Sequence, residues 1–222
     1  MKKAIIAILI LLTGMSAFAQ NGVIRELSGT VELKAPGSSS FVSANPGDTV
    51  SANSVISTGF KSTALVAVGS ALITVRPLTR LTLMEIQSSQ GTETINANLQ
   101  TGRVRVDVNP PAGTRANMSV SSPVATASVR GTGYELDSKN LKVHHGSVRF
   151  SGKRGYTRTV FAGSRSKVQD DGKAADPIQL RYSDLVPSSP PGTGESGGSS
   201  GSARNHNENI YGYITIKIEY PD

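Results

Sequence analysis

The stretches GRVRVDVNPPAG (residues 102–113) and SPVATASVRGTGYEL (residues 122–136) set the pattern of this chain, which has almost no helical periodicity. In the first stretch, three valines alternate with Arg103, Arg105 and Asp107. Successive side chains of a β-strand point to opposite faces, so this alternation predicts a half-buried strand with the valines inward. The two arginines and the carboxylate then share the other face of that strand.

Similar short apolar segments recur along the chain and are separated by turns of Gly, Asn, Pro and Asp. Regularly spaced strands of this kind predict an all-β domain, and no segment before residue 176 shows a sustained period of 3.6. We expect strands at residues 23–27, 30–33, 55–58, 63–68, 71–75, 80–84, 93–98, 102–108, 118–122, 127–130, 134–137, 141–143, 147–150, 158–161 and 166–169.

A Gly-x-Val-x-apolar pattern occurs three times, beginning at Gly29, Gly102 and Gly146. Glycine tolerates a positive φ, so the pattern is typical of a tight turn followed by a half-buried strand. The unequal spacing argues against a solenoid with a fixed repeat. The expected architecture is therefore a sandwich or an irregular β-helix of many short strands.

The chain opens with MKKAIIAILILLTGMSAFAQ, which has two lysines, an apolar run at residues 4–12, and small residues at Ala17 and Ala19. These features predict a signal peptide at residues 1–19, cleaved after Ala19. A membrane anchor is the alternative, but a span needs about 20 apolar residues and this run is interrupted earlier. We therefore expect a periplasmic or secreted protein with no stable membrane span after cleavage.

Composition limits the kinds of partner that the protein can bind and the interactions that can stabilise its fold. The precursor has a formal net charge of +7 and no cysteine. Loss of the two leader lysines would leave a charge of about +5, a modest excess for an exported protein. Nucleic acid is not expected as a partner, because no stretch combines basic with stacking aromatic residues. Without disulfides, the fold must rest on aliphatic burial and backbone pairing.

The C-terminal part of the chain changes composition. After the predicted β domain (residues 20–176) and a short domain end (residues 177–186), residues 187–203 are rich in Ser, Gly and Pro and predict a flexible linker. Residues 204–222 contain YGYITIKIEY, which alternates like one apolar-faced strand. A single strand is not stable alone, so we expect it either to complete an edge of its own sheet or to add to a partner.

Candidate catalytic and metal-binding patterns are weak. A G-x-S-x-G match at residues 194–198 lies in the predicted linker, where no strand and helix can frame a nucleophile. His144 and His145 are adjacent on a predicted strand, so we expect their rings on opposite faces, where one metal ion cannot bind both. The sequence therefore predicts a non-enzymatic protein without a cofactor or metal site.

The arginines allow two interpretations. Arg103 and Arg105 share a predicted face with Asp107, and Arg130 stands in a segment of small apolar residues. Because a buried guanidinium needs a partner, structural ion pairing is the first interpretation. In the second, Arg103, Arg105 and Arg130 form a shallow cationic patch with Tyr134, which binds an anionic envelope polymer or an acidic protein loop.

Three blocks in order carry a family resemblance: GDTVSANSVISTGFKSTALVAVGSALITVRPLTRLTL (residues 47–83) and the two stretches quoted first. Together they resemble the FecR domain, a bacterial extracytoplasmic module, over roughly residues 22–170. The matching positions are mostly glycines, small residues and core aliphatics, which define a fold and no chemistry.

The best-known members of that family are iron-uptake regulators. They join a cytoplasmic segment acting on a sigma factor, a membrane span, and a periplasmic FecR domain that receives a signal from an outer-membrane transporter. Here only Met1 to Lys3 precede the apolar run, so we expect no sigma-factor segment. The resemblance implies a module that binds a protein or polymer in the bacterial envelope. The alternative is a component of a FecR-type signalling system; a hydrolase ranks last, and the sequence leaves the oligomeric state open.

Overall fold

The computed structural model describes residues 21–185, which belong to the first of the two units, residues 1–186 and 187–222, into which the chain divides. The predicted leader (residues 1–19), linker (residues 187–203) and C-terminal strand segment (residues 204–222) lie outside the described residues. Within residues 21–185, no helix has the length and apolar character that a bilayer crossing requires.

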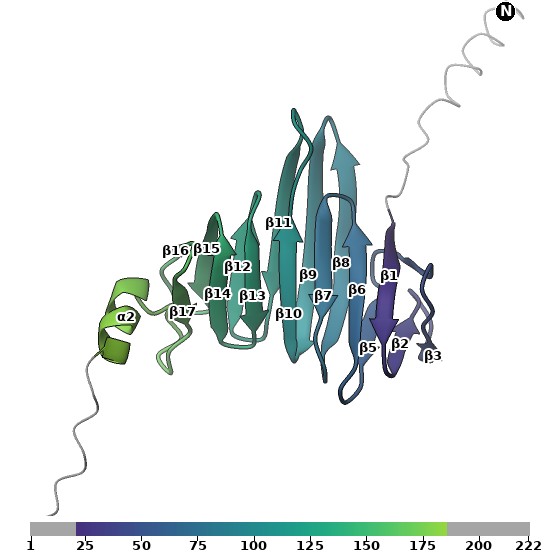
Figure 1. Ribbon diagram of the computed structural model, residues 1–222, viewed down its shortest axis with the longest axis horizontal. Helices are drawn as coiled ribbons and strands as arrows, with labels where there is room; N and C mark the ends of the chain where they lie inside the picture. Colours follow the sequence, from purple (N-terminus) through teal and green to yellow (C-terminus); the bar gives the residue numbers. More distant parts are fainter. Residues whose placement is uncertain (1–20, 186–222) are drawn as a thin grey trace, which may run out of the picture. The chain divides into compact units, whose positions relative to one another are not determined.

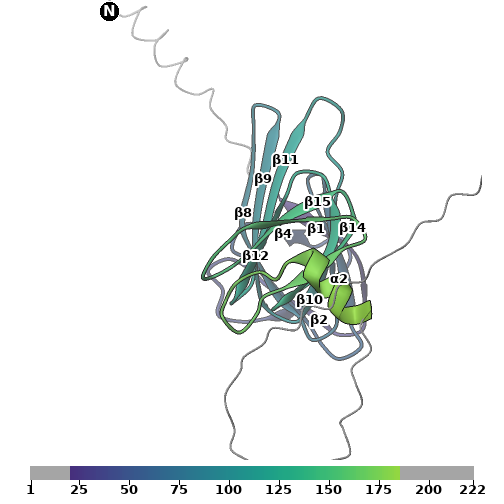
Figure 2. The ribbon, with the colours of Figure 1, turned by 90° about the vertical axis from the view of Figure 1, so that its left-hand side faces the viewer.

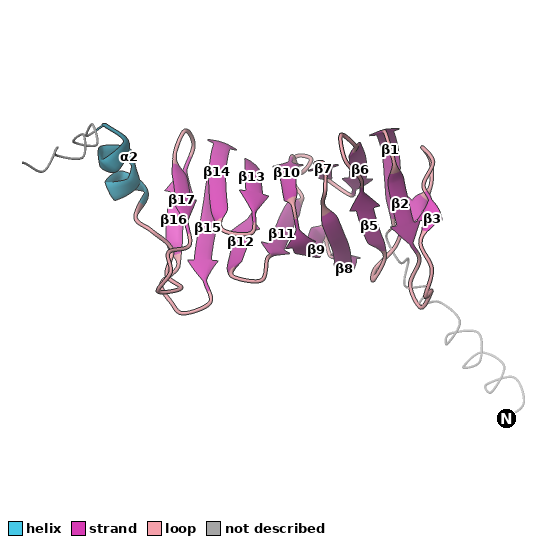
Figure 3. Cartoon of the chain, turned by 90° about the horizontal axis from the view of Figure 1, so that it is seen from below, coloured by secondary structure: helices cyan, strands magenta, loops and turns pink. Residues whose placement is uncertain are grey.

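Two sheets make up the described part of the chain, and Figure 3 shows them as two layers. Sheet A has eight strands in the order β17 (Arg165–Lys167), β14 (Asn140–His145), β13 (Gly133–Asp137), β10 (Arg103–Val108), β7 (Ala71–Val75), β6 (Thr63–Val68), β1 (Gly22–Ser28) and β4 (Thr49–Val50). Sheet B has nine strands in the order β16 (Arg158–Phe161), β15 (Ser147–Gly152), β12 (Ala125–Val129), β11 (Arg115–Ser121), β9 (Thr92–Thr101), β8 (Arg80–Ser89), β5 (Val55–Thr58), β2 (Val31–Lys34) and β3 (Val42–Ser43).

The chain moves steadily from one end of both sheets to the other (Figure 1). From β5 onward it places one or two strands in one sheet, crosses to the other, and returns beside its own earlier strands. Neighbours are antiparallel except β9 and β11, which run parallel because β10 crosses between them in sheet A. The two layers are also seen end-on in Figure 2. The all-β prediction is confirmed: the fold is a sandwich in which the chain winds as in an irregular solenoid.

The core lies between the sheets and is mainly aliphatic. The alternation predicted for β10 is confirmed, since Val104, Val106 and Val108 are buried while Arg103 is exposed. The largest fully buried side chains are Tyr134 on β13 and Phe150 on β15. Each sheet therefore packs one face against the shared core and turns its other face toward solvent.

The three Gly-x-Val turns are confirmed and share one contact. Gly29, Gly102 and Gly146 have φ values of 75°, 88° and 74°, and each packs against the hydroxyl of a buried residue in a neighbouring turn, respectively Ser62, Thr79 and Thr132.

At the second turn, a Cβ on Gly102 would lie 2.5 Å from the Thr79 Cα, so only glycine fits. The Thr79 Oγ1 accepts a hydrogen bond from the backbone N–H of Arg103 at 2.9 Å. This contact positions the first arginine of β10.

The β-domain ends in the nine-residue helix α2 (Pro177–Leu185), which was not predicted. Asp176 caps its start, because the Asp176 Oδ1 accepts the backbone N–H of Ile178 at 2.8 Å. Pro177 occupies the first turn, where its missing N–H costs nothing. Strands β3 and β4, two residues each, were also not predicted.

Candidate functional site

The outer face of sheet A gathers ionisable side chains from four neighbouring strands and the turn after β7. We call this surface the charged face. The register sets Arg103 opposite Asp137 and Arg105 opposite Glu135 across β10 and β13, and continues from Glu135 to Lys142 on β14. The charged face comprises Arg76, Arg103, Arg105, Asp107, Glu135, Asp137, Lys142, His144, His145, Arg165 and Lys167.

Ion pairs link the central side chains of the charged face. The Arg105 Nε donates to the Asp107 Oδ2 at 2.9 Å, and the Arg76 Nη2 donates to the Glu135 Oε1 at 3.1 Å. The hydrogen bond from Arg105 to Asp107 and the charge of that carboxylate raise the pKa of the Arg105 guanidinium. The structural-pairing interpretation of Arg103 and Arg105 therefore holds for their immediate contacts.

Asp137 closes the turn between β13 and β14. Its Oδ1 accepts the backbone N–H groups of Lys139 and Asn140 at 2.9 and 2.8 Å, and its Oδ2 lies 3.6 Å from the Arg103 Nη2. Burial alone would raise the pKa of Asp137, but these hydrogen bonds, the Asn140 side chain and the Arg103 charge together lower it. Asp137 is thus ionised, and it joins the turn to β10.

The histidines depart from the sequence prediction. The pairing of β13 with β14 shifts register between Gly133 and Tyr134, where β14 carries an extra residue. This bulge turns both rings to the charged face: the His144 Nε2 lies 4.0 Å from the Glu135 Oε1, and the His145 Nε2 lies 3.5 Å from the Asp107 Oδ1. The expectation of opposite faces is wrong, because it assumed unbroken alternation.

Gly133 makes the His145 contact possible. The register places Asp107, Gly133 and His145 in one row across three strands. A Cβ on Gly133 would collide with the His145 Nε2 and would lie 2.6 Å from the Asp107 Oδ1. The missing side chain on the middle strand therefore lets two side chains meet across it.

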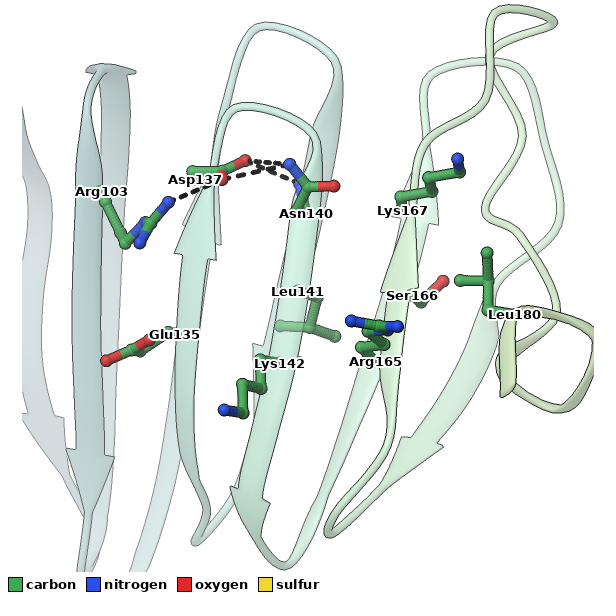
Figure 4. Close-up of a pocket in the computed structure, with 10 residues that line it drawn as sticks. All are labelled: Arg103, Glu135, Asp137, Asn140, Leu141, Lys142, Arg165, Ser166, Lys167 and Leu180. Atoms are coloured by element: carbon green, nitrogen blue, oxygen red, sulfur yellow. Dashed lines mark hydrogen bonds and ion pairs between the residues drawn. The ribbon is translucent and has the colours of Figure 1, made fainter. Parts of the chain in front are cut away.

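A shallow groove of about 440 Å³ lies at the β14–β17 end of the charged face, and Figure 4 shows the side chains around it. Four cationic side chains and two carboxylates line it, with Leu180 of α2 at its edge: Arg103, Lys142, Arg165, Lys167, Glu135 and Asp137. The groove thus carries an excess of positive charge, although the charged face as a whole mixes both signs. Among residues 21–185, no three His, Cys, Asp or Glu side chains converge as metal ligands would.

The four residues of the predicted patch do not come together. Arg103 and Arg105 lie on the charged face, but Arg130 follows β12 in sheet B and is exposed there. Tyr134 points into the core with no exposed surface, and its Oη has no hydrogen-bond partner among the described residues. Burial raises the pKa of its hydroxyl. Neither Arg130 nor Tyr134 can therefore contribute to a surface shared with β10.

Sequence reasoning missed the contributions of Arg76 and the two histidines to the charged face. Glu135 and Asp137 alternate with Tyr134 and Leu136 within one predicted strand. That alternation is a usable signal, because it places both carboxylates on the face opposite Tyr134. The partner strand of each carboxylate was not readable from the alternation.

Comparison with solved structures finds weak similarity to two crystal structures, at 1.65 and 2.50 Å resolution, of a proposed anti-sigma factor from Parabacteroides distasonis. The identity is 12% and the TM-score is 0.45, over 57% of this chain and 62% of that protein, which is less than two thirds of its length. No curated protein matches the chain. Residues 54–154 match the profile of the family described as FecR protein, from Ser54 before β5 to Arg154 after β15. The matched residues include most of the charged face, and this part of the chain is similar to the FecR family.

Proposed function

We propose that this protein is a non-enzymatic binding module of the bacterial envelope that holds a protein partner on the charged face. FecR-family proteins are envelope-associated and regulatory rather than enzymatic, which supports both the location and the kind of activity. The predicted signal peptide supports a periplasmic or secreted location. The charged face supplies the surface on which a partner would dock.

The observation that carries the proposal is the mixture of signs on an open sheet face. The paired side chains remain partly exposed, with 39% for Arg105, 24% for Asp107 and 22% for Glu135. Exposed ion pairs contribute little to folding stability, roughly 0–1 kcal/mol each. Such charges can exchange their partners for those of another protein, and complementary charge gives specificity and fast association.

The mixture of positive and negative charges also distinguishes the two partner classes that the sequence leaves open, a protein and an anionic polymer. A uniform polyanion would meet Asp107, Glu135 and Asp137 among the cations and would be repelled by them. A protein surface can match both signs, and an acidic loop fits the groove where cations outnumber carboxylates. The charged face therefore favours a protein partner over an anionic polymer.

Site-specific photo-crosslinking in the producing bacterium tests this proposal. A photoreactive residue at Lys142 on the charged face should give one discrete cross-linked product, which Arg103→Ala with Arg105→Ala should weaken. The matched control is the same photoreactive residue at Thr126, on the outer face of sheet B. No product at Lys142, or the same product from both positions, would contradict the proposal.

The FecR match also favours a second candidate, a component of an envelope signalling system coupled to a transporter or a sigma-factor regulator. Deletion of the gene should then change transcription of a neighbouring operon. The variant with Arg103→Ala and Arg105→Ala should reproduce that change if signalling passes through the charged face. Unchanged transcription after deletion would remove this candidate and leave the binding module.

A further inference from the structure

The outer face of sheet B has a chemistry that the charged face lacks. Five neighbouring strands align Asn96 on β9 with Ser119 on β11, Ser128 on β12, Arg149 on β15 and Thr159 on β16. At about 4.8 Å between strands, this row is about 19 Å long. Beside it, the register aligns Asn98 with Ser121 and Thr126.

We call this surface the hydroxyl–amide face, made of Thr94, Asn96, Asn98, Asn117, Ser119, Ser121, Thr126 and Ser128. Its members are partly or fully exposed. Hydrogen bonds between strands hold some of them, with 3.2 Å between the hydroxyls of Ser119 and Ser128. Asn96 donates to Glu85 on β8, which marks the acidic end of the row.

Two arginines lie away from this acidic end: Arg149 is in the row on β15, and Arg130 directly follows β12. Arg130 and Arg149 are exposed, and within the described part of the chain neither forms an ion pair. They line a groove of about 460 Å³ together with Thr94, Asn117, Ser119 and Ser128. No carboxylate lines this groove, so its charge is wholly positive. This contrasts with Arg103 and Arg105, which are paired on the charged face.

An aromatic ring stands beside the same groove. Phe161 on β16 pairs in register with Ser147, which lines the groove. The neighbouring Val160 is buried, so alternation turns Phe161 outward, and it is 64% exposed. An exposed phenyl ring next to a polar row offers an apolar flat surface at the edge of a hydrogen-bonding array.

We propose that the hydroxyl–amide face, with Arg130, Arg149 and Phe161, binds an anionic polysaccharide. Amide and hydroxyl side chains both donate and accept hydrogen bonds, as pyranose hydroxyls do. The unpaired arginines match carboxylates on the sugar rings, since a guanidinium binds a carboxylate through two parallel hydrogen bonds. The phenyl ring packs against the C–H face of a pyranose.

Other ligand classes fit this face less well. Strong binding to a nucleic acid backbone requires many cations to displace counterions, and this groove holds two. A protein interface is usually centred on buried aromatic or apolar anchors, whereas the centre of this face is polar. The linear arrangement of similar groups suits a polymer of similar units. The proposal is independent of the partner assigned to the charged face, which lies on the other sheet.

The test is calorimetric titration of the full chain with polygalacturonate, a pyranose polymer that carries a carboxylate on each ring. Dextran serves as the neutral polysaccharide, and the ionic strength is about 0.15 M so that distant charges are screened. We expect binding to polygalacturonate and at least tenfold weaker binding to dextran. Arg130→Gln with Arg149→Gln should weaken polygalacturonate binding at least tenfold, and Phe161→Ala should weaken it about threefold.

The matched control is Arg103→Gln with Arg105→Gln, which removes the same charge from the opposite sheet. This control should bind polygalacturonate as the unchanged chain does, and the thermal unfolding midpoint of each variant verifies its fold. Equal losses in the two double variants would overturn the proposal, because net charge alone would explain the binding. It would also be overturned by the absence of binding, or by tighter binding to poly(U) than to polygalacturonate that depends on Arg130 and Arg149.

Discussion

Sheet A turns ionised side chains outward on β10, β13 and β14, whereas sheet B turns hydroxyl and amide side chains outward on β9, β11 and β12. Both faces arise from the same strand alternation over one shared core. On sheet A, arginines meet carboxylates on the next strand or on their own. On sheet B, Arg130 and Arg149 meet none among the described residues. The same strand alternation therefore produces different surfaces, because the neighbouring strands decide whether an arginine meets a carboxylate.

The largest expected effect comes from comparing a buried ring in the shared core with an exposed ring on sheet B. Phe150→Ala removes a fully buried ring on β15 and should lower the free energy of unfolding by about 3–5 kcal/mol. Phe161→Ala removes an exposed ring from the adjacent strand and should change it by less than about 0.5 kcal/mol. Urea unfolding measures both. Similar losses would mean that Phe161 is not a surface residue.

A second substitution tests the turn that positions the charged face. Gly102→Ala places a Cβ against the Thr79 backbone, so it should cost about 1–3 kcal/mol more than Gly47→Ala. Gly47 is the matched control, because it also has a positive φ, 94°, but a Cβ added there would meet no other atom within 4 Å. Urea unfolding of both variants gives the difference. Equal costs would show that backbone strain, and not the close approach, accounts for the effect.

The third prediction concerns the carboxylate that joins β13 to β10. Asp137→Asn should lower the free energy of unfolding by about 1–2 kcal/mol at neutral pH, because it removes charged hydrogen bonds and the pairing with Arg103. The folded pKa of Asp137 is lowered, so its contribution is complete above the unfolded pKa of about 4. That contribution disappears as the pH falls through the folded pKa.

Unfolding measured from pH 7 to pH 2 should therefore show a smaller acid-dependent loss in Asp137→Asn than in the unchanged chain. Glu26→Gln, at an exposed carboxylate on β1, is the control and should keep the original pH dependence. An identical pH profile for Asp137→Asn and the unchanged chain would remove Asp137 as a source of acid sensitivity.

The smallest expected effect compares a paired with an unpaired arginine directly. Arg105→Gln breaks the contact with Asp107 and should cost about 0.5 kcal/mol, a difference that added salt reduces. Arg149→Gln breaks no ion pair and should leave stability unchanged within error. Thermal unfolding at low and high salt measures both. Equal, salt-independent losses of stability in the two variants would mean that the ion pair of Arg105 does not distinguish it from Arg149.

Much of the strand pattern was predictable because alternation is a local property. The predicted bounds of β5, β6, β7 and β16 agree with the structure. The two-residue strands β3 and β4 were missed, because two residues are too few to show alternation and such edges are defined by their hydrogen bonds to neighbouring strands. Helix α2 was missed although Asp176 and Pro177 form a usual helix start.

For the candidate site, the sequence predicted which side chains share a face only when they belong to the same strand. Arg103, Arg105 and Asp107 were correctly placed on one face, because all three belong to β10. Arg130 and Tyr134 were grouped with Arg103 and Arg105 in one cationic patch, yet Arg130 lies beyond β12 in sheet B and Tyr134 points into the core. The chain changes sheet between them, and no local pattern reports that crossing.

Periodicity along the chain was thus sufficient to assign an all-β domain, an aliphatic interior and the inward or outward direction of most side chains. Long-range pairing settled which strands became neighbours, which arginines found carboxylates, and where the bulge at His144 reversed the alternation. The physical reason is that side-chain direction depends on one strand's own backbone, whereas the partner of a side chain depends on hydrogen bonds to strands far along the chain.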